Sequence, residues 1–230
     1  MSGRALFVAG TDTGIGKTHA ACTLLHALQA AGQRACGMKP VASGSLETPE
    51  GLRNEDALAL LAAGGAPLPY AAVNPVALRE PLSPHLAAAY EGVTVRMPPL
   101  RDAFERLRAA HDWVVVEGVG GWRVPLAPDL LASDIPRQWR LPVVLVVGLR
   151  LGCLNHALLS AEAIAADGCQ LLGWIGNRID PAMMALEDNL ATLRERLPAP
   201  CLGVLPHGLS PAEAASGLDL GPLLGLSHRA

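Results

Sequence analysis

Aromatic side chains, excess positive charge and long apolar runs are all scarce in this sequence. Aromatic residues occupy 3% of its 230 positions, so the core must be built mainly from Leu, Val and Ala. A net charge of −3, with Lys and Arg scattered along the chain, offers no basic patch for nucleic acid or for an anionic membrane surface. No apolar run approaches the roughly 20 residues that a membrane-spanning helix needs. We therefore expect no nucleic-acid partner and no membrane partner.

Disulfide, zinc and serine-hydrolase patterns are also missing. The cysteines number five, an odd count, and none forms a CxxC pair. The histidines show no HExxH spacing, and there is no GxSxG turn. The N-terminus lacks the apolar core and the cleavage site of a signal peptide. We therefore expect a cytoplasmic protein whose cysteines are small buried apolar residues, namely Cys22, Cys36, Cys153, Cys169 and Cys201.

Strand-like and helix-like segments alternate along the whole chain, with no visible linker or repeat. Buried strands are predicted at 5–9, 34–38, 113–116, 143–147, 171–176 and 201–205, and helices at 20–31, 54–63, 84–90, 98–110, 131–139, 155–166 and 183–197. Loops at 41–53 and 64–84 and a C-terminal tail with little pattern complete the chain. This alternation predicts one α/β domain over residues 1–230, with a mostly parallel central sheet and helices on both faces.

A glycine-rich loop, Gly10–Thr18, follows the first predicted strand and leads into the first predicted helix. Strand, glycine-rich turn and helix in this order are the context in which such a loop binds phosphate. The glycines leave backbone N–H groups open to phosphate oxygens, and Lys17 adds a positive charge for the β and γ phosphates. Thr18 places a hydroxyl where a magnesium ion could use it. The sequence therefore predicts a phosphate-binding loop of the P-loop type, one residue longer than the common template.

Polar side chains also follow other predicted strands, and the carboxyl ends of parallel strands meet at one edge of a sheet. Lys39 follows strand 34–38 and could stabilise phosphoryl transfer, or it could be a surface lysine with an exposed ammonium group. Glu117 follows strand 113–116 and could be a magnesium ligand or a solvated carboxylate. Asp56 lies in a first helical turn, where the helix dipole favours an acid even without a function.

Two further segments allow two interpretations each. Asn177 ends strand 171–176 and could hydrogen-bond a purine, or it could be a turn residue before Pro181. The segment Leu151–His156 precedes a predicted helix, and its backbone N–H groups could hold a carboxylate. An ordinary asparagine cap would explain the same segment.

Taken together, these residues resemble the dethiobiotin synthetase family of biotin biosynthesis. The resemblance runs over nearly the whole chain, through the segments GTDTGIGKT, MKPVASGS, PEGLRNEDALAL, VNP, EPLSPH, VVVEGVGGWRVPL, LPVVLVVGLRLGCLNHALL and PAPCLGVLP. It implies an ATP-dependent cyclo-ligase that closes the ureido ring of dethiobiotin from 7,8-diaminononanoate and carbon dioxide, with magnesium. It also implies a homodimer with the substrate near the interface.

The resemblance also implies roles for individual residues. Lys17 and Lys39 would neutralise carbamate and phosphate oxygens, and Thr13 with the amides of the loop would contact phosphate. Thr18, Asp56 and Glu117 would hold magnesium. The remaining implied contacts are Gly14, Ile15, Gly16, Gly118, Val119, Gly120, Asn177, Arg178, Pro206, His207 and Gly208 for the nucleotide, and Asp12, Ser43, Gly152, Cys153, Leu154 and Asn155 for the diamine.

The sequence departs from the family at Gly14, where relatives often carry an acidic residue that touches the nucleotide. Two other classes of function compete with this reading. A P-loop kinase for a small molecule would need an arginine-rich lid, whereas only Arg137 and Arg140 are spaced between the strands concerned. A switch or partitioning ATPase would carry an additional lysine near the start of the loop, and Thr11, Asp12 and Thr13 supply none.

Overall fold

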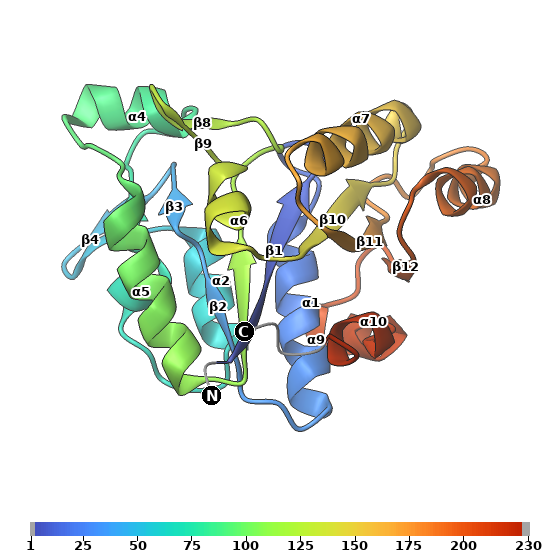
Figure 1. Cartoon of the computed structure of the whole chain (residues 1–230), viewed down its shortest axis with the longest axis horizontal. Helices are drawn as coiled ribbons and strands as arrows, with labels where there is room; N and C mark the ends of the chain where they lie inside the picture. Colours follow the sequence, from blue (N-terminus) through green and yellow to red (C-terminus); the bar gives the residue numbers. More distant parts are fainter. Residues whose placement is uncertain (1–2, 227–230) are drawn as a thin grey trace.

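The computed structural model describes residues 3–226, and a six-stranded parallel sheet forms its centre (Figure 1). The strand order is β12-β11-β10-β1-β7-β2, and each neighbouring pair is parallel. The strands are β1 (Arg4–Gly10), β2 (Ala35–Met38), β7 (Trp113–Glu117), β10 (Val143–Gly148), β11 (Leu171–Asn177) and β12 (Cys201–Leu205). All six coincide with predicted strands to within one or two residues, and the predicted fold class is confirmed.

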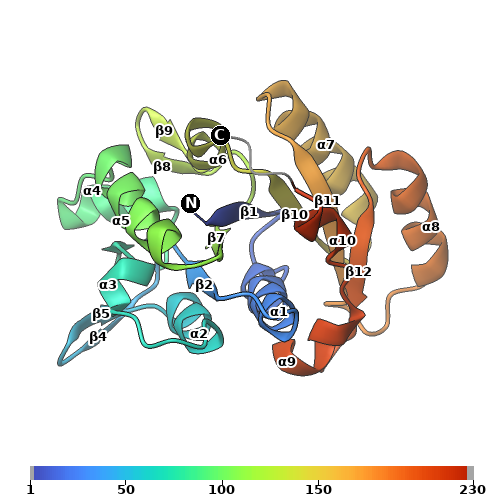
Figure 2. The same ribbon diagram turned by 60° about the horizontal axis from the view of Figure 1, so that its bottom comes forward.

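Helices cover both faces of this sheet (Figure 2). One face carries α1 (Lys17–Ala30), α2 (Glu55–Ala63), α9 (Pro211–Ala214) and α10 (Gly221–Leu224). The other face carries α4 (Pro84–Glu91), α5 (Met97–Ala110), α6 (Asp134–Trp139), α7 (Cys153–Ala166) and α8 (Leu186–Arg196). The strands that follow β1 in the chain, β2 and β7, lie on one side of β1 in the sheet, and the later strands β10, β11 and β12 lie on its other side. The carboxyl end of β1 is therefore a topological switch point, where ligands bind in such folds.

The alternation of side chains along β7 decides where its last residue points. Val114 and Val116 pack in the core on the α5 side of the sheet, whereas Trp113 and Val115 pack in the core on the α1 side. Successive side chains of a strand point to opposite faces, so Glu117 continues the second set. The carboxylate therefore faces α1 and the phosphate-binding loop.

Two predicted loops contain short elements that the sequence did not indicate. Segment 41–53 holds β3 (Val41–Ala42) and the antiparallel hairpin of β4 (Leu46–Thr48) and β5 (Gly51–Arg53). Segment 64–84 holds α3 (Tyr70–Val73) and β6 (Val76–Ala77), and β6 pairs in parallel with β3. Strands of two or three residues are too short to show a period, and only their pairing with a distant segment identifies them.

Other predicted boundaries are wrong for similar reasons. The helix predicted at 131–139 begins at Asp134, because the preceding residues form a hairpin of β8 (Pro125–Ala127) and β9 (Leu130–Leu131). The helix predicted at 183–197 begins at Leu186, after Ala185 adopts a φ of 51°. The C-terminal tail adds α9, a 3₁₀ turn (Ala215–Gly217) and α10. Cys169 and Cys201 are only half-buried, whereas the other cysteines are buried as predicted.

Helix α2 begins with the predicted cap. The side chain of Asn54 accepts a hydrogen bond from the backbone N–H of Ala57 at 3.2 Å. Replacing Asn54 by alanine is expected to lower the free energy of unfolding by at least about 1 kcal/mol, because the buried N–H of Ala57 loses its acceptor and the backbone oxygen of Ser43 loses a donor. Urea unfolding would measure this loss. Ser83→Ala is the matched control, since the Ser83 hydroxyl precedes α4 but contacts the ring of His85 and not a helix N–H. An equal loss in both variants would contradict the expectation.

No helix within residues 3–226 combines the length and the apolar character that crossing a bilayer demands.

Candidate active site

The phosphate-binding loop joins β1 to α1 at the switch point of the sheet, as predicted. Gly14 and Gly16 have φ values of 72° and 81°, a left-handed conformation that favours glycine. Gly16 is also the N-cap of α1, and no side chain caps this helix. The first N–H groups of α1 are therefore free of side-chain caps, which is the arrangement that suits an anion.

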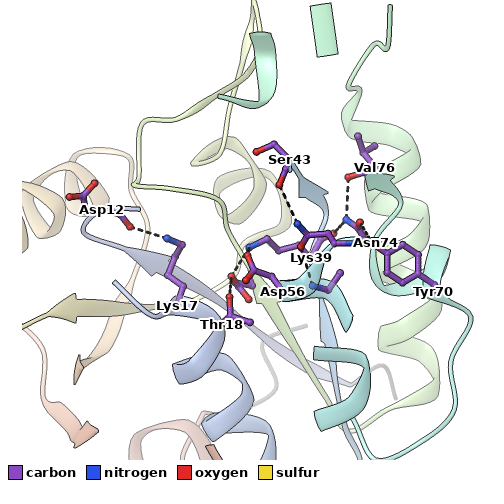
Figure 3. Close-up of polar contacts among 12 residues, drawn as sticks. Asp12, Lys17, Thr18, Lys39, Ser43, Asp56, Tyr70, Asn74 and Val76 are labelled. Atoms are coloured by element: carbon purple, nitrogen blue, oxygen red, sulfur yellow. Dashed lines mark hydrogen bonds and ion pairs between the residues drawn. The ribbon is translucent and has the colours of Figure 1, made fainter. Parts of the chain in front are cut away.

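The loop lysine is held in place by the loop itself. The Nζ of Lys17 donates a hydrogen bond to the backbone oxygen of Asp12 at 2.9 Å (Figure 3). Gly10 leaves room for the stem, because a Cβ there would lie 2.7 Å from Cδ of Lys17. Burial and the neighbouring charge of Lys39 lower the pKa of Lys17 to about 8. Within the described residues, no carboxylate lies at hydrogen-bond distance from the Lys17 ammonium group. A phosphate that enters the loop would provide a negative partner for it.

A buried cluster of charged side chains lies next to the loop. The Nζ of Lys39 is 2.9 Å from Oδ2 of Asp56 (Figure 3) and 2.5 Å from Oε1 of Glu117. The hydroxyl of Thr18 donates to the same oxygen of Glu117 at 2.9 Å. Lys39 and Glu117 are only 2% and 1% exposed. The structure therefore rules out both the surface lysine and the solvated carboxylate. Four segments separated along the chain, at the ends of β2 and β7 and the starts of α1 and α2, build this cluster.

Charge pairing keeps Lys39 protonated in this buried position. Burial alone would lower its pKa, but Glu117 and Asp56 outweigh that effect, and the pKa of Lys39 lies above its ordinary value. Burial raises the pKa of Glu117, with Lys39 opposing the shift. For Asp56, which is less buried, burial is outweighed by Lys39, and the pKa is lowered. Lys17 and Lys39 are the only lysines of the chain, and both lie in this site.

The same cluster has the donor atoms that magnesium prefers. Thr18, Asp56 and Glu117 bring one hydroxyl and two carboxylates together, and Oε2 of Glu117 has no hydrogen-bond partner within the described residues. Magnesium takes hard oxygen ligands and is commonly bound through one or two carboxylates together with water and phosphate. These residues therefore fit the predicted metal.

Arg150 contacts a predicted site residue, Asp12, and the sequence analysis did not single it out. Its Nη2 lies 2.6 Å from Oδ2 of Asp12, and the other carboxylate oxygen of Asp12 accepts from the N–H of Thr13 at 2.7 Å. This contact ties the turn after β10 to the phosphate-binding loop. A weaker signal existed, because Arg150 lies in the turn that follows predicted strand 143–147, whereas Lys39 follows its strand directly.

The turn before α7 is open to solvent. Leu151 is 96% exposed, Gly152 has a φ of 96°, and no side chain caps the helix. Cys153 is buried and Leu154 half-buried, while Asn155 is exposed. Within residues 3–226, the side chain of Asn155 makes no hydrogen bond to the cluster around Lys39. The N-cap of α7 is Gly152, so the interpretation of Asn155 as an ordinary asparagine cap is wrong. The interpretation in which the backbone N–H groups of this turn hold a carboxylate stays a prediction.

The predicted nucleotide-base residues meet at the carboxyl ends of β11 and β12. The N–H of Arg178 donates to the backbone oxygen of Leu205 at 3.0 Å, and Nδ1 of His207 lies 3.1 Å from the oxygen of Arg178. Pro206, His207 and Gly208 are exposed beside them. Asn177 is buried, and its Nδ2 donates to the backbone oxygen of Ile15 at 2.9 Å. The structure thus gives Asn177 a contact with the phosphate-binding loop that neither sequence interpretation included.

The remaining predicted residues line the same edge of the sheet. Gly118 packs tightly on β1, since a Cβ there would lie 2.7 Å from Cζ of Phe7. Gly120 has a φ of 57° and lies beside Thr13, whose Oγ1 would be 3.4 Å from such a Cβ. Val119 between them is half-buried. The backbone oxygen of Ser43 accepts from Nδ2 of Asn54 at 3.2 Å, which places Ser43 near the start of α2.

The comparisons with known proteins agree with this geometry. A family model described as AAA domain matches residues 4–212. The ATP-dependent dethiobiotin synthetase BioD of Xanthomonas euvesicatoria pv. vesicatoria is 56% identical over 222 residues, covering 96% of this chain and 99% of that protein. The protein of the same name from Xylella fastidiosa is 56% identical over 221 residues, covering 95% of this chain and 98% of that protein.

Similar solved structures are more distant in sequence. The MinC:MinD cell division protein complex of Aquifex aeolicus contains a chain with a TM-score of 0.54 and 15% identity, covering 99% of this chain and 98% of that one. Chloroplast FtsY from Physcomitrella patens has a TM-score of 0.53 and 17% identity, covering 97% of this chain and 64% of that one. At these identities the likeness concerns the fold alone.

Proposed function

The chain belongs to the ATP-dependent dethiobiotin synthetase family, and we propose that it closes the ureido ring of dethiobiotin from 7,8-diaminononanoate, carbon dioxide and ATP. The observation that carries this proposal is the buried cluster of Lys39, Glu117, Asp56 and Thr18 beside a phosphate-binding loop. A site with two buried lysines suits a reaction in which a carbamate and a triphosphate, both anionic, must approach each other.

The reaction has three steps. An amine of the substrate adds to carbon dioxide and loses a proton, which gives a carbamate. A carbamate oxygen attacks the γ-phosphorus of ATP, and ADP leaves. The second amine then attacks the carbonyl carbon of the mixed anhydride and loses a proton to the departing phosphate or to water, and phosphate leaves as the ring closes. The carbamate is already a nucleophile, so the phosphoryl step needs no basic side chain, and Lys17 and Lys39 would neutralise the oxygens that gain charge.

Thr18, Asp56 and Glu117 would hold magnesium, which neutralises phosphate charge when bound. The loop N–H groups of Gly14, Ile15 and Gly16, with Thr13, would bind the phosphates. Segment 118–120 would form the floor of the site, and Asn177 and Arg178 with segment 206–208 would surround the base. In this scheme Asn177 would also hold the phosphate-binding loop in place, through its hydrogen bond to the backbone oxygen of Ile15.

For the diamine, Asp12 would lie near the amine end and Ser43 near the carbamate. The exposed turn Gly152–Asn155 would bind the carboxylate tail of a diamine held mainly by a second copy of the chain, so we propose a homodimer. The open N-terminus of α7, without a side-chain cap, supports this assignment. Arg150 would couple this turn to the phosphate-binding loop through Asp12.

We further propose that residues 1–230 form one domain in the cytoplasm. One sheet, with strands between residues 4 and 205, runs through most of the described chain and supports a single domain. The five cysteines, none of them in a disulfide, support a reducing compartment.

Incorporation of labelled bicarbonate tests the function directly. The purified protein is incubated with ATP, magnesium and 7,8-diaminononanoate, beside a reaction that lacks the diamine. We expect an acid-stable labelled product that requires both ATP and the diamine. If ATP is hydrolysed without fixation of label, the phosphate-binding loop stands but the substrate assignment fails, and a small-molecule kinase becomes the better reading. Hydrolysis that requires a partner macromolecule would favour a switch ATPase instead.

A further inference from the structure

A partly buried hydrogen-bond network lies behind the charged cluster, on the side away from the phosphate-binding loop (Figure 3). Its centre is Asn74, the residue that follows α3, which is 3% exposed. Nδ2 of Asn74 donates to the backbone oxygen of Lys39 at 2.7 Å and to that of Val76 at 3.1 Å. Its Oδ1 accepts from the hydroxyl of Tyr70, one helical turn earlier, at 2.8 Å. Both polar atoms of the Asn74 amide group are therefore used.

Tyr70 carries this network to the start of α2. Its hydroxyl accepts from the backbone N–H of Asn54 at 2.8 Å. Asn54 in turn caps α2 and donates to the backbone oxygen of Ser43 at 3.2 Å. The guanidinium of Arg53 lies 4.4 Å from the centre of the Tyr70 ring, which also restrains the ring.

Three residues with proposed roles in the reaction are attached to this network. Lys39 is held through its backbone oxygen, Ser43 through its backbone oxygen, and Asp56 through the capped first turn of α2. Regular secondary structure fixes only part of this arrangement. The pairing of β3 with β6 holds the chain between Lys39 and Ser43, whereas the hairpin β4–β5 separates Ser43 from Asp56 on α2. Together with the ion pair of Lys39 and Asp56, the network sets the distances between the three residues.

We propose that Tyr70 and Asn74 are positioning residues that hold Lys39, Ser43 and Asp56 in the arrangement the reaction needs. This inference rests on the function proposed above. Neither side chain is proposed to touch a substrate. The physical argument is that buried polar groups cost free energy unless they are paired. Asn74 uses its buried amide on Lys39 as well as on Val76, and Tyr70 joins Asn74 to Asn54, so the pair connects segments that carry proposed site residues. Small displacements of reacting groups are costly in turnover.

The first test is Tyr70→Phe. This change keeps the ring and its contact with Arg53 but removes the hydroxyl, so that the N–H of Asn54 and Oδ1 of Asn74 both lose a partner. We expect turnover to fall by about 10-fold to 10²-fold, as for misplaced catalytic groups. The KM for ATP should change by less than about twofold, because the phosphate-binding loop is outside the network.

Tyr90→Phe is the matched control. Tyr90 is the other tyrosine of the chain, is 74% exposed, and makes no side-chain hydrogen bond within residues 3–226. It should retain wild-type turnover and thermal stability. Turnover is expressed per ATP-binding site, so a loss of folded protein cannot imitate the effect.

A second variant, Asn74→Asp, tests the contact with Lys39 and distinguishes positioning from stability alone. Asn74→Asp keeps an acceptor for Tyr70 but replaces the donor to Lys39 by a second oxygen, so it should be at least as inactive as Tyr70→Phe. The magnesium concentration for half activity should also rise in both variants, because Asp56 is displaced.

The outcomes separate the two proposals. If wild type and Tyr90→Phe fix no labelled bicarbonate, the proposed function fails. If they do fix label, and Tyr70→Phe matches them in turnover per site and in magnesium dependence, the positioning role is wrong. If Tyr70→Phe has a lower melting temperature but unchanged turnover per site, the network stabilises the fold and does not position the reacting groups.

Discussion

Replacing Lys39 by glutamine is expected to lower turnover by about 10²-fold or more while ATP still binds. Lys39 is buried, is charged and lies between Glu117 and Asp56, so its ammonium group is fixed before any substrate arrives. A preorganised charge of this kind stabilises a phosphoryl-transfer transition state more than it stabilises the ground state. Single-turnover measurements and ATP titration of the same preparation would separate the two effects.

The substitution also has a predictable structural side effect. Glutamine leaves the buried carboxylate of Glu117 without a positive partner, which commonly costs about 3–5 kcal/mol when a buried pair is broken. The double variant Lys39→Gln with Glu117→Gln removes both charges together and should recover much of that stability. It should remain inactive. Near-normal turnover in Lys39→Gln would remove Lys39 from the reaction, and recovery of activity in the double variant would show that only stability had been lost.

The second large effect is expected on magnesium. Glu117→Gln should raise the magnesium concentration for half activity by at least about tenfold, since even indirect partners of metal ligands cost 10–100-fold in affinity. Asp56→Asn should have a smaller effect of the same sign, because the Asp56 side chain is 45% exposed and water can replace part of its contribution. Titration of activity with magnesium at saturating ATP would measure both.

Glu55→Gln is the matched control for this pair. Glu55 precedes Asp56 in the same helical turn and is exposed, so it has the same dipole environment without a place in the cluster. It should leave the magnesium titration unchanged. A wild-type titration in Glu117→Gln or in Asp56→Asn would exclude that carboxylate as a ligand, and a shift equal to theirs in Glu55→Gln would point to a general loss of negative charge.

The two experiments also test each other. Lys39 and magnesium would draw on the same carboxylate oxygens, so Lys39→Gln frees Glu117 and Asp56 from their present partner. That variant should therefore bind magnesium no more weakly than the wild type, although it turns over slowly. Loss of magnesium binding in Lys39→Gln would indicate that the lysine organises the metal site itself.

Much of the site could be read from the sequence because it depends on local patterns. Strand, glycine-rich turn and helix are contiguous, so Gly10–Thr18 identified the phosphate-binding loop without any knowledge of distant residues. The apolar runs before Lys39 and Glu117 indicated two central strands, and parallel strands bring their carboxyl ends to one edge. The family resemblance then supplied roles that residue types alone do not determine.

Tertiary structure alone decided how these residues meet. Side-chain alternation along β7 turns Glu117 toward α1. Whether its carboxylate contacts Lys39, Asp56 or only water depends on the relative positions of β2, β7 and α2. The same holds for Arg150, whose partner Asp12 lies 138 positions away, and for the contact of Tyr70 and Asn74 with Lys39. A periodic pattern specifies which face of an element is buried, whereas a hydrogen bond or an ion pair between distant segments requires their relative position to within a few tenths of an ångström, and only the packed core sets that position.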